Sequence, residues 1–141
     1  MKKTIFALAF SSLLIIACKK DHNELQDITP TVQTLSGSYK MAKITARVSG
    51  GPEQDITNNY LSACQKDDVH KLNSNLTYDY MDAGTVCSSD GSYSGVWSLP
   101  SSTSIIIDGE TASILKFNGS NLNISYDLGS GNALLYYLIK Q

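Results

Sequence analysis

The sequence predicts an all-β fold: an antiparallel up-and-down barrel of about eight strands with one short helix. Three observations predict it. Short β-type segments recur about every 8 to 12 residues, turn-forming residues separate them, and long helical periodicity is absent. With 141 residues, 42% of them hydrophobic, the chain suits one domain. A barrel hides every strand edge at this length, and a two-sheet sandwich is the alternative.

The first 17 residues have the pattern of a bacterial export signal. Lys2 and Lys3 form its positive end, and the apolar stretch 4–17 is shorter than the ~20 residues that cross a bilayer as a helix. The stretch ends in Ile-Ile-Ala-Cys18, which resembles the lipobox of bacterial lipoproteins. That resemblance implies cleavage before Cys18 and a lipid on Cys18 that ties the protein to a membrane.

Residues 18–35 are expected to form a polar tether. Lysines and acidic residues follow Cys18 directly, similar to the surface-export tags of Bacteroidota lipoproteins, although solvated charges would serve a tether equally well. We expect an outer-membrane location, on the periplasmic or the cell-surface face. Removal of the signal leaves nine basic against thirteen acidic residues, so nucleic acid is not an expected partner.

The folded part, residues 36–141, should begin with a strand over 38–48 that the Ser-Gly-Gly-Pro run at 49–52 ends. Residues 55–64 are the best candidate for the helix, capped by Asp55 or Thr57. Residues 68–73 and 77–81 should form a hairpin around Ser74-Asn75, and 92–99 a strand with Tyr93 and Trp97 on one face.

The C-terminal third contains the strongest turn signals. Asp108-Gly109 and Gly119 predict tight hairpins between strands 104–108, 111–118 and 121–128. In 121–128 apolar and polar residues alternate completely, as a half-buried antiparallel strand requires. The last strand, 133–140, is apolar on both faces, so it should occupy a central or barrel-sealing position.

These features, in this order, resemble the lipocalin-like domains of Bacteroidota lipoproteins. The resemblance rests on Leu35-Ser-Gly-Ser-Tyr-Lys40, Cys64-Gln-Lys-Asp-Asp68, Cys87, Gly95-Val-Trp-Ser-Leu99 and the C-terminal meander. It implies a small tethered barrel whose end is closed by an aromatic side chain, here Tyr39 where lipocalins have Trp. It brings no catalytic residues. These domains often place Gly at the position of Leu76, so we expect a different loop there, because leucine adopts positive φ at a cost.

With Cys18 assigned to lipid, Cys64 and Cys87 remain in an oxidising compartment, and a disulfide is the default expectation. It should stabilise the domain by roughly 3 kcal/mol. The pair lacks the Cys-x-x-Cys spacing of exchange catalysts. We therefore expect its role to be structural.

Candidate catalytic and metal-binding groups are few. His70 is the only histidine of the folded part, and no serine has the spacing of a hydrolase nucleophile. Asp67, Asp68 and His70 could bind a metal, yet no further ligand completes a site. We expect no enzyme activity, no metal and no cofactor. An enzyme would require His70 to face a cleft.

The sequence leaves two functions open. The first is non-enzymatic binding of a small hydrophobic or amphipathic ligand inside the barrel, in contact with the candidate residues Tyr39, Met41, Tyr93, Trp97 and Tyr126. These aromatic residues could equally form a filled core. In that case the barrel would serve as an interaction or accessory subunit of a cell-surface assembly, through loops 50–60 and 84–92.

Overall fold

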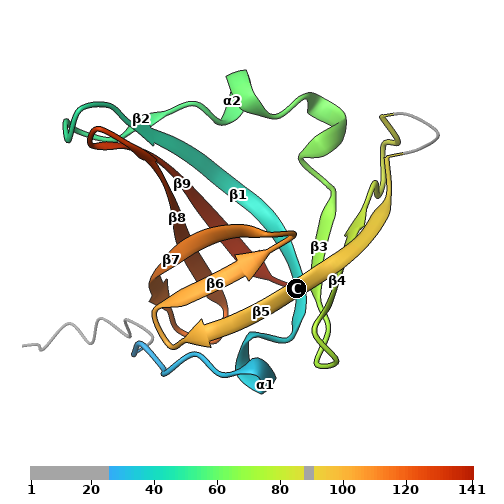
Figure 1. The fold of residues 1–141 in the computed structure, drawn as a ribbon. Helices are drawn as coiled ribbons and strands as arrows, with labels where there is room; N and C mark the ends of the chain where they lie inside the picture. Colours follow the sequence, from blue (N-terminus) through green and yellow to red (C-terminus); the bar gives the residue numbers. More distant parts are fainter. Residues whose placement is uncertain (1–25, 88–90) are drawn as a thin grey trace, which may run out of the picture.

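The computed structural model describes residues 26–87 and 91–141, and within them the chain forms the expected antiparallel barrel (Figure 1). The sheet runs in the order β2-β1-β3-β4-β5-β6-β7-β8-β9, and β9 also pairs with β1, so eight of its strands close into a ring. The strands are β1 Gly37–Arg47, β2 Gln54–Asp55, β3 Val69–Leu72, β4 Thr77–Met81, β5 Tyr93–Ser101, β6 Ser104–Ile107, β7 Glu110–Phe117, β8 Asn121–Gly129 and β9 Asn132–Lys140.

β9 seals the ring, as its two apolar faces predict. It pairs with β8 on one side and with nearly the whole length of β1 on the other. β1 is the longest strand because it has two partners on its second edge, β3 at its start and β2 at its end. A bulge at Ala42 reverses the alternation along β1, so Tyr39 and Met41 are buried before the bulge and Ile44 after it.

The hairpins follow the predicted turn signals, with one exception. Asp108 and Gly109 both have positive φ in the two-residue turn from β6 to β7, and Gly119 has positive φ between β7 and β8. The exception is the β3–β4 hairpin, where Leu76 has a φ of 68°. The expectation that leucine would avoid this conformation was wrong. Asn75 Oδ1 accepts the backbone N–H of Thr77 at 3.1 Å, and Leu76 O accepts the backbone N–H of Trp97 at 2.9 Å, which together hold the loop.

The segment expected to be a helix over 55–64 contains only one turn of α-helix. It divides into β2, α2 (Thr57–Tyr60) and the 3₁₀ turn η1 (Ala63–Gln65). The N-cap of α2 is Ile56, so the expectation of Asp55 or Thr57 as the cap was wrong, although Asp55 Oδ1 accepts the Thr57 N–H at 2.9 Å. The Ile44 N–H donates to Thr57 Oγ1 at 2.9 Å, which binds the start of α2 to β1.

The folded unit extends N-terminal to the predicted boundary at residue 36. Helix α1 (Val32–Leu35) lies at one end of the barrel (Figure 1), and Leu35 is fully buried there. The Ile28 N–H donates to the Phe117 carbonyl oxygen at 2.9 Å. We name this end, where α1 lies, the closed end. The remaining part of the predicted tether, 18–25, lies outside the described residues, as do the predicted signal and Cys18.

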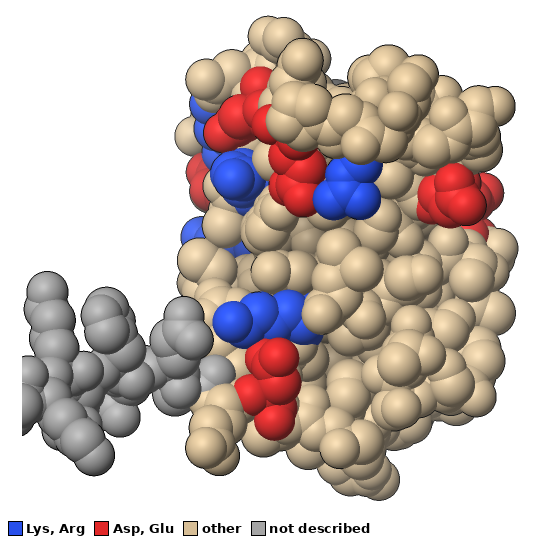
Figure 2. Space-filling view, turned by 90° about the vertical axis from the view of Figure 1, so that its left-hand side faces the viewer, with Lys and Arg blue, Asp and Glu red and all other residues tan. Residues whose placement is uncertain are grey.

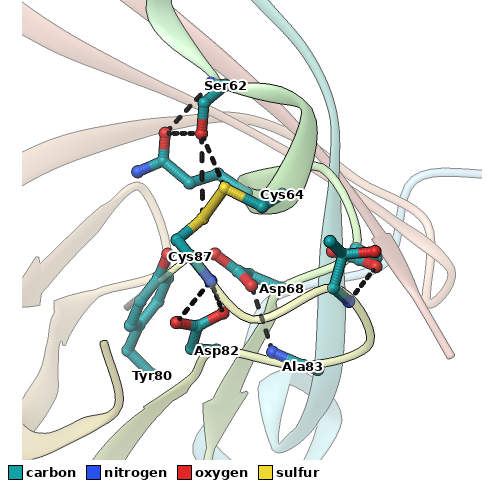
Figure 3. The surroundings of a disulfide bond; sticks show 10 residues. Ser62, Cys64, Asp68, Tyr80, Asp82, Ala83 and Cys87 are labelled. Carbon is teal, nitrogen blue, oxygen red and sulfur yellow. Dashed lines mark hydrogen bonds between the residues drawn. A yellow bond between two sulfur atoms is a disulfide. The ribbon is translucent and has the colours of Figure 1, made fainter. Parts of the chain in front are cut away.

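The predicted disulfide is present. Cys64 in η1 is bonded to Cys87, with 5.3 Å between their Cα atoms. Figure 3 shows the pair beside Ser62 and above Asp68, whose carboxylate accepts hydrogen bonds from the Tyr80 hydroxyl and, at 3.1 Å, from the Ala83 N–H. The bond therefore ties the segment between β1 and β3 to the segment that follows β4.

Candidate functional site

The barrel is not filled. A cavity of about 400 Å³ lies inside it, which is within the ~300 to 1,000 Å³ range of small-molecule sites. The residues that line it come from the inner faces of the strands: Tyr39, Met41, His70, Leu72, Tyr78, Tyr93, Ile107, Asp108, Glu110, Leu122, Ile124, Tyr126, Leu128, Leu134, Tyr136 and Leu138.

The mouth of the cavity lies at the end of the barrel opposite α1. β1 begins at the closed end and the strands are antiparallel, so the β6–β7 turn and the β8–β9 turn both lie at the other end. Asp108 and Glu110 belong to the first of these turns, and Leu128 and Leu134 flank the second. Leu128 is 61% exposed although it lines the cavity, as a residue at an opening would be.

At the closed end, packed side chains form the floor of the cavity. The Tyr39 hydroxyl donates a 2.6 Å hydrogen bond to the Leu35 carbonyl oxygen. Burial raises the pKa of Tyr39. Lys140 Nζ lies 5.7 Å from the centre of the Tyr39 ring and donates to the Thr34 carbonyl oxygen at 2.8 Å. Gly37 makes room for this lysine, because a Cβ there would lie 2.3 Å from Lys140 Cε.

Four of the five predicted ligand contacts line this cavity: Tyr39, Met41, Tyr93 and Tyr126. The fifth, Trp97, does not line it. Its side chain is 2% exposed and packs in the core, and its Nε1–H donates to the Asn73 carbonyl oxygen at 2.9 Å. Trp97 has the same inward direction as Tyr93, but it lies nearer the closed end, where the core fills the barrel.

Sequence reasoning missed two further tyrosines on the cavity wall, one from β4 and one from β9. Tyr78 contacts Tyr93 at 5.9 Å between ring centres, and Tyr136 contacts Tyr126 at 5.1 Å. Five of the eight tyrosines of the chain therefore line the cavity. The sequence did contain a signal for them, because residues two apart in a strand share a face. Tyr136, for example, shares its face with Leu134 and Leu138.

His70 lies on the cavity wall. Its Nδ1 shares a 2.7 Å hydrogen bond with the Tyr78 hydroxyl, and its ring lies 5.3 Å from that of Tyr80. Burial lowers the pKa of His70, opposed by the charge of Asp68. The cavity lining, as far as the described residues form it, contains no serine, cysteine or threonine that could act with this histidine as a nucleophile.

The acidic residues next to His70 accept hydrogen bonds from the segment 80–85. Asp68 is 1% exposed and binds Tyr80 and Ala83, while Asp67 Oδ2 accepts the Thr85 N–H at 2.9 Å. Within residues 26–87 and 91–141, no three His, Cys, Asp or Glu side chains are arranged to hold a metal ion.

The outer surface has mixed charge. Arg47 forms a 3.0 Å salt bridge with Glu53, and Lys43 Nζ lies 4.8 Å from the centre of the Tyr137 ring. Figure 2 shows one face of the molecule, on which positive and negative side chains lie next to one another with no extended patch of one sign. No helix in the described part of the chain is both long and apolar enough to cross a membrane.

A scan of the sequence against protein-family models matches none, and searches of curated proteins and of solved structures find no similar protein. The inference of function therefore rests on the cavity and on the sequence.

Proposed function

We propose that this protein is a non-enzymatic binding module that holds one small hydrophobic or amphipathic molecule inside its barrel. The single observation that carries the proposal is the cavity of about 400 Å³, lined mainly by aliphatic and tyrosine side chains. Packed interiors rarely contain voids larger than a water molecule. A barrel that leaves this much apolar volume open sacrifices packing, and ligand binding is the function that such a cavity supports best.

The wall has the amphipathic character that the proposed ligand needs. Met41, Leu72, Ile124 and Leu138 provide apolar surface in the barrel, whereas Tyr93, Tyr126 and the two carboxylates provide polar contacts nearer the mouth. An alkyl or aryl group would be buried in the interior, and a polar group would remain at the opening. The alternative, a packed-core interaction subunit, offers no account of the open volume.

The test is native mass spectrometry of the full chain purified from its own host's envelope without organic solvent. We expect a population heavier than the protein by one small, constant mass, which mild collisional activation removes. A bare protein in such extracts, together with failure to bind any hydrophobic or amphipathic probe in titration, would overturn the proposal.

We also propose that the module is lipidated on Cys18 and tethered to the outer membrane, as in the lipocalin-like lipoproteins of Bacteroidota that the sequence resembles. The support is the order of the basic pair, the apolar stretch and Ile-Ile-Ala-Cys18. The Cys18→Ser variant should leave the membrane fraction on cell fractionation. Cys64→Ser/Cys87→Ser is the control, since it replaces the other two cysteines and keeps Cys18. Membrane retention of the Cys18→Ser variant would contradict the anchor.

A further inference from the structure

The charged side chains that line the cavity are all acidic. Asp108 and Glu110 lie on either side of Gly109 in the β6–β7 turn, and no lysine or arginine is among the described residues of the lining. The lowered pKa of His70 keeps that ring neutral at pH 7. The cavity therefore carries two carboxylates without a positive partner inside it.

The Asp108 carboxylate is held in place by β5. Its Oδ1 accepts the Val96 N–H at 3.0 Å, and its own N–H donates to the Val96 carbonyl oxygen at 2.8 Å. The neighbouring Gly95 is required for this position, because a Cβ there would lie 1.7 Å from Oδ1. Burial and the charge of Asp108 both raise the pKa of Tyr93. The negative charge of Asp108 is therefore felt by a residue of the cavity wall.

Glu110 begins β7 and lies two residues before Ala112, which is buried in the barrel core. Because side chains alternate along a strand, Glu110 has the same inward direction, at the mouth. Burial, and next the charge of Glu110, raise the pKa of Tyr126 to about 12. Among the described residues, Glu110 forms no salt bridge.

No lysine or arginine of the described residues lines the cavity, and three of them have partners elsewhere. Lys43 and Arg47 interact with Tyr137 and Glu53 on the outside of the barrel, and Lys140 binds the Thr34 carbonyl oxygen at the closed end. The negative charge at the mouth therefore has no internal counter-ion in the part of the chain that the structure describes.

Tyrosines share the cavity lining with the two carboxylates. Tyr93 lies on β5, Tyr126 on β8 and Tyr136 on β9. A cation over the face of a tyrosine ring gains about 0.5 to 2 kcal/mol, more where water is excluded. Rings together with carboxylates at the opening of an apolar cavity form an environment suited to an ammonium group.

We propose that the ligand of this cavity is an organic cation: an amine or quaternary ammonium group at the mouth, near Asp108 and Glu110, joined to an apolar body inside the barrel. This inference rests on the proposed binding function and specifies its ligand class. An anionic amphiphile of the same shape would place its charge beside two carboxylates, with no cationic side chain to offset the repulsion.

Three probes of equal chain length test the inference: octylammonium, 1-octanol and octanoate, each titrated calorimetrically into the full chain at pH 7 and low ionic strength. We expect octylammonium to bind at least about tenfold more tightly than octanoate, with 1-octanol between them. The two carboxylates attract the ammonium group and repel the octanoate carboxylate, and the two binding free energies should differ by more than about 1.4 kcal/mol. Added salt should reduce the difference in affinity between octylammonium and octanoate, because it screens the charges.

The double variant Asp108→Asn/Glu110→Gln removes both charges and keeps the side-chain shapes. The asparagine amide oxygen would still be able to accept the Val96 N–H, and asparagine suits a turn position with positive φ. We expect the preference for octylammonium over octanoate to fall by about tenfold, while the affinity for 1-octanol stays within twofold. Asp127→Asn is the matched control: Asp127 carries the same charge and its Oδ1 likewise accepts a turn N–H, from Gly129 at 2.8 Å. It should leave the preference unchanged.

The outcomes separate this inference from the function on which it rests. If 1-octanol or octanoate binds as tightly as octylammonium, or if the double variant keeps the preference, the protein remains a binding module and the cationic ligand class is wrong. If none of the three probes binds, the proposed binding function fails, and this inference fails with it.

Discussion

The Tyr39 hydroxyl donates a 2.6 Å hydrogen bond to the carbonyl oxygen of Leu35, and both residues are almost completely buried. This bond joins the first long strand of the barrel to the end of helix α1, which is only four residues long. A helix of this length has little stability of its own. Its position at the closed end therefore depends on tertiary contacts such as this one.

Tyr39→Phe removes the hydroxyl and leaves the Leu35 carbonyl oxygen buried without this partner. We expect the free energy of unfolding to fall by about 1 to 2 kcal/mol in urea titration. Tyr137→Phe is the control, because the Tyr137 hydroxyl donates to Glu53 on the exposed side of the barrel, where water can replace it. Equal losses for the two variants would contradict a special role for the buried bond.

Much of the fold could be predicted from sequence because its signals are local. The alternation in 121–128, the Asp108-Gly109 turn and the apolar last strand each specify a strand or hairpin without knowledge of distant residues. The bulges in β1 and β7 could not be predicted: Ala42 and Leu115 are inserted where the strand must bend, and that need arises from closure of the ring. The docking of Ile28 and α1 depends on the same closure.

The candidate site was predicted in part for a related reason. Alternation identifies which side chains point inward, and it placed Tyr39, Tyr93 and Tyr126 correctly on the inner face. It does not indicate how far along the barrel axis the packed core ends. Trp97 lies below that limit and Tyr136 above it, so one was included in the predicted contacts and the other was missed.

Leu76 occupies a backbone conformation that favours glycine, with a φ of 68°, and its side chain is 40% exposed. Leu76→Gly should therefore raise the free energy of unfolding by about 0.5 to 1 kcal/mol, because strain is relieved and little packing is lost. Ile139→Gly is the control. It also removes an exposed aliphatic side chain, 44% accessible, but from a regularly paired position inside β9, and it should destabilise. A loss of stability in Leu76→Gly would contradict the claim that the positive φ of Leu76 is strained.

The Cys64–Cys87 bond closes a loop across a sequence separation of 23 residues. In the chain-entropy account its loss should lower the free energy of unfolding by about 3 kcal/mol. Urea titrations with and without a reductant measure this loss. The Cys64→Ser/Cys87→Ser variant should have the stability of the reduced wild type and should not respond to reductant. A response in that variant would show that the reductant acts elsewhere.

His70 should make stability dependent on pH. Burial holds its pKa below the ordinary value of 6.5. The contribution is fully present above pH 6.5 and is lost as pH falls from 6.5 through the folded-state pKa, because the unfolded chain binds the proton first. In denaturant titrations between pH 7.5 and 5, wild type should lose more stability than His70→Gln, which removes the titrating ring. Equal losses would show that His70 is not responsible.

Leu128 lines the cavity mouth and is 61% exposed, so it can be enlarged with little disturbance of the core. Leu128→Trp should place an indole across the opening and weaken the binding of octylammonium and 1-octanol at least about tenfold, because apolar contact with the interior is obstructed. Leu115→Trp is the control, since it makes the same exchange on the outer surface of β7. Both variants should unfold at wild-type denaturant concentrations. Wild-type affinity in Leu128→Trp would place the probes outside this cavity.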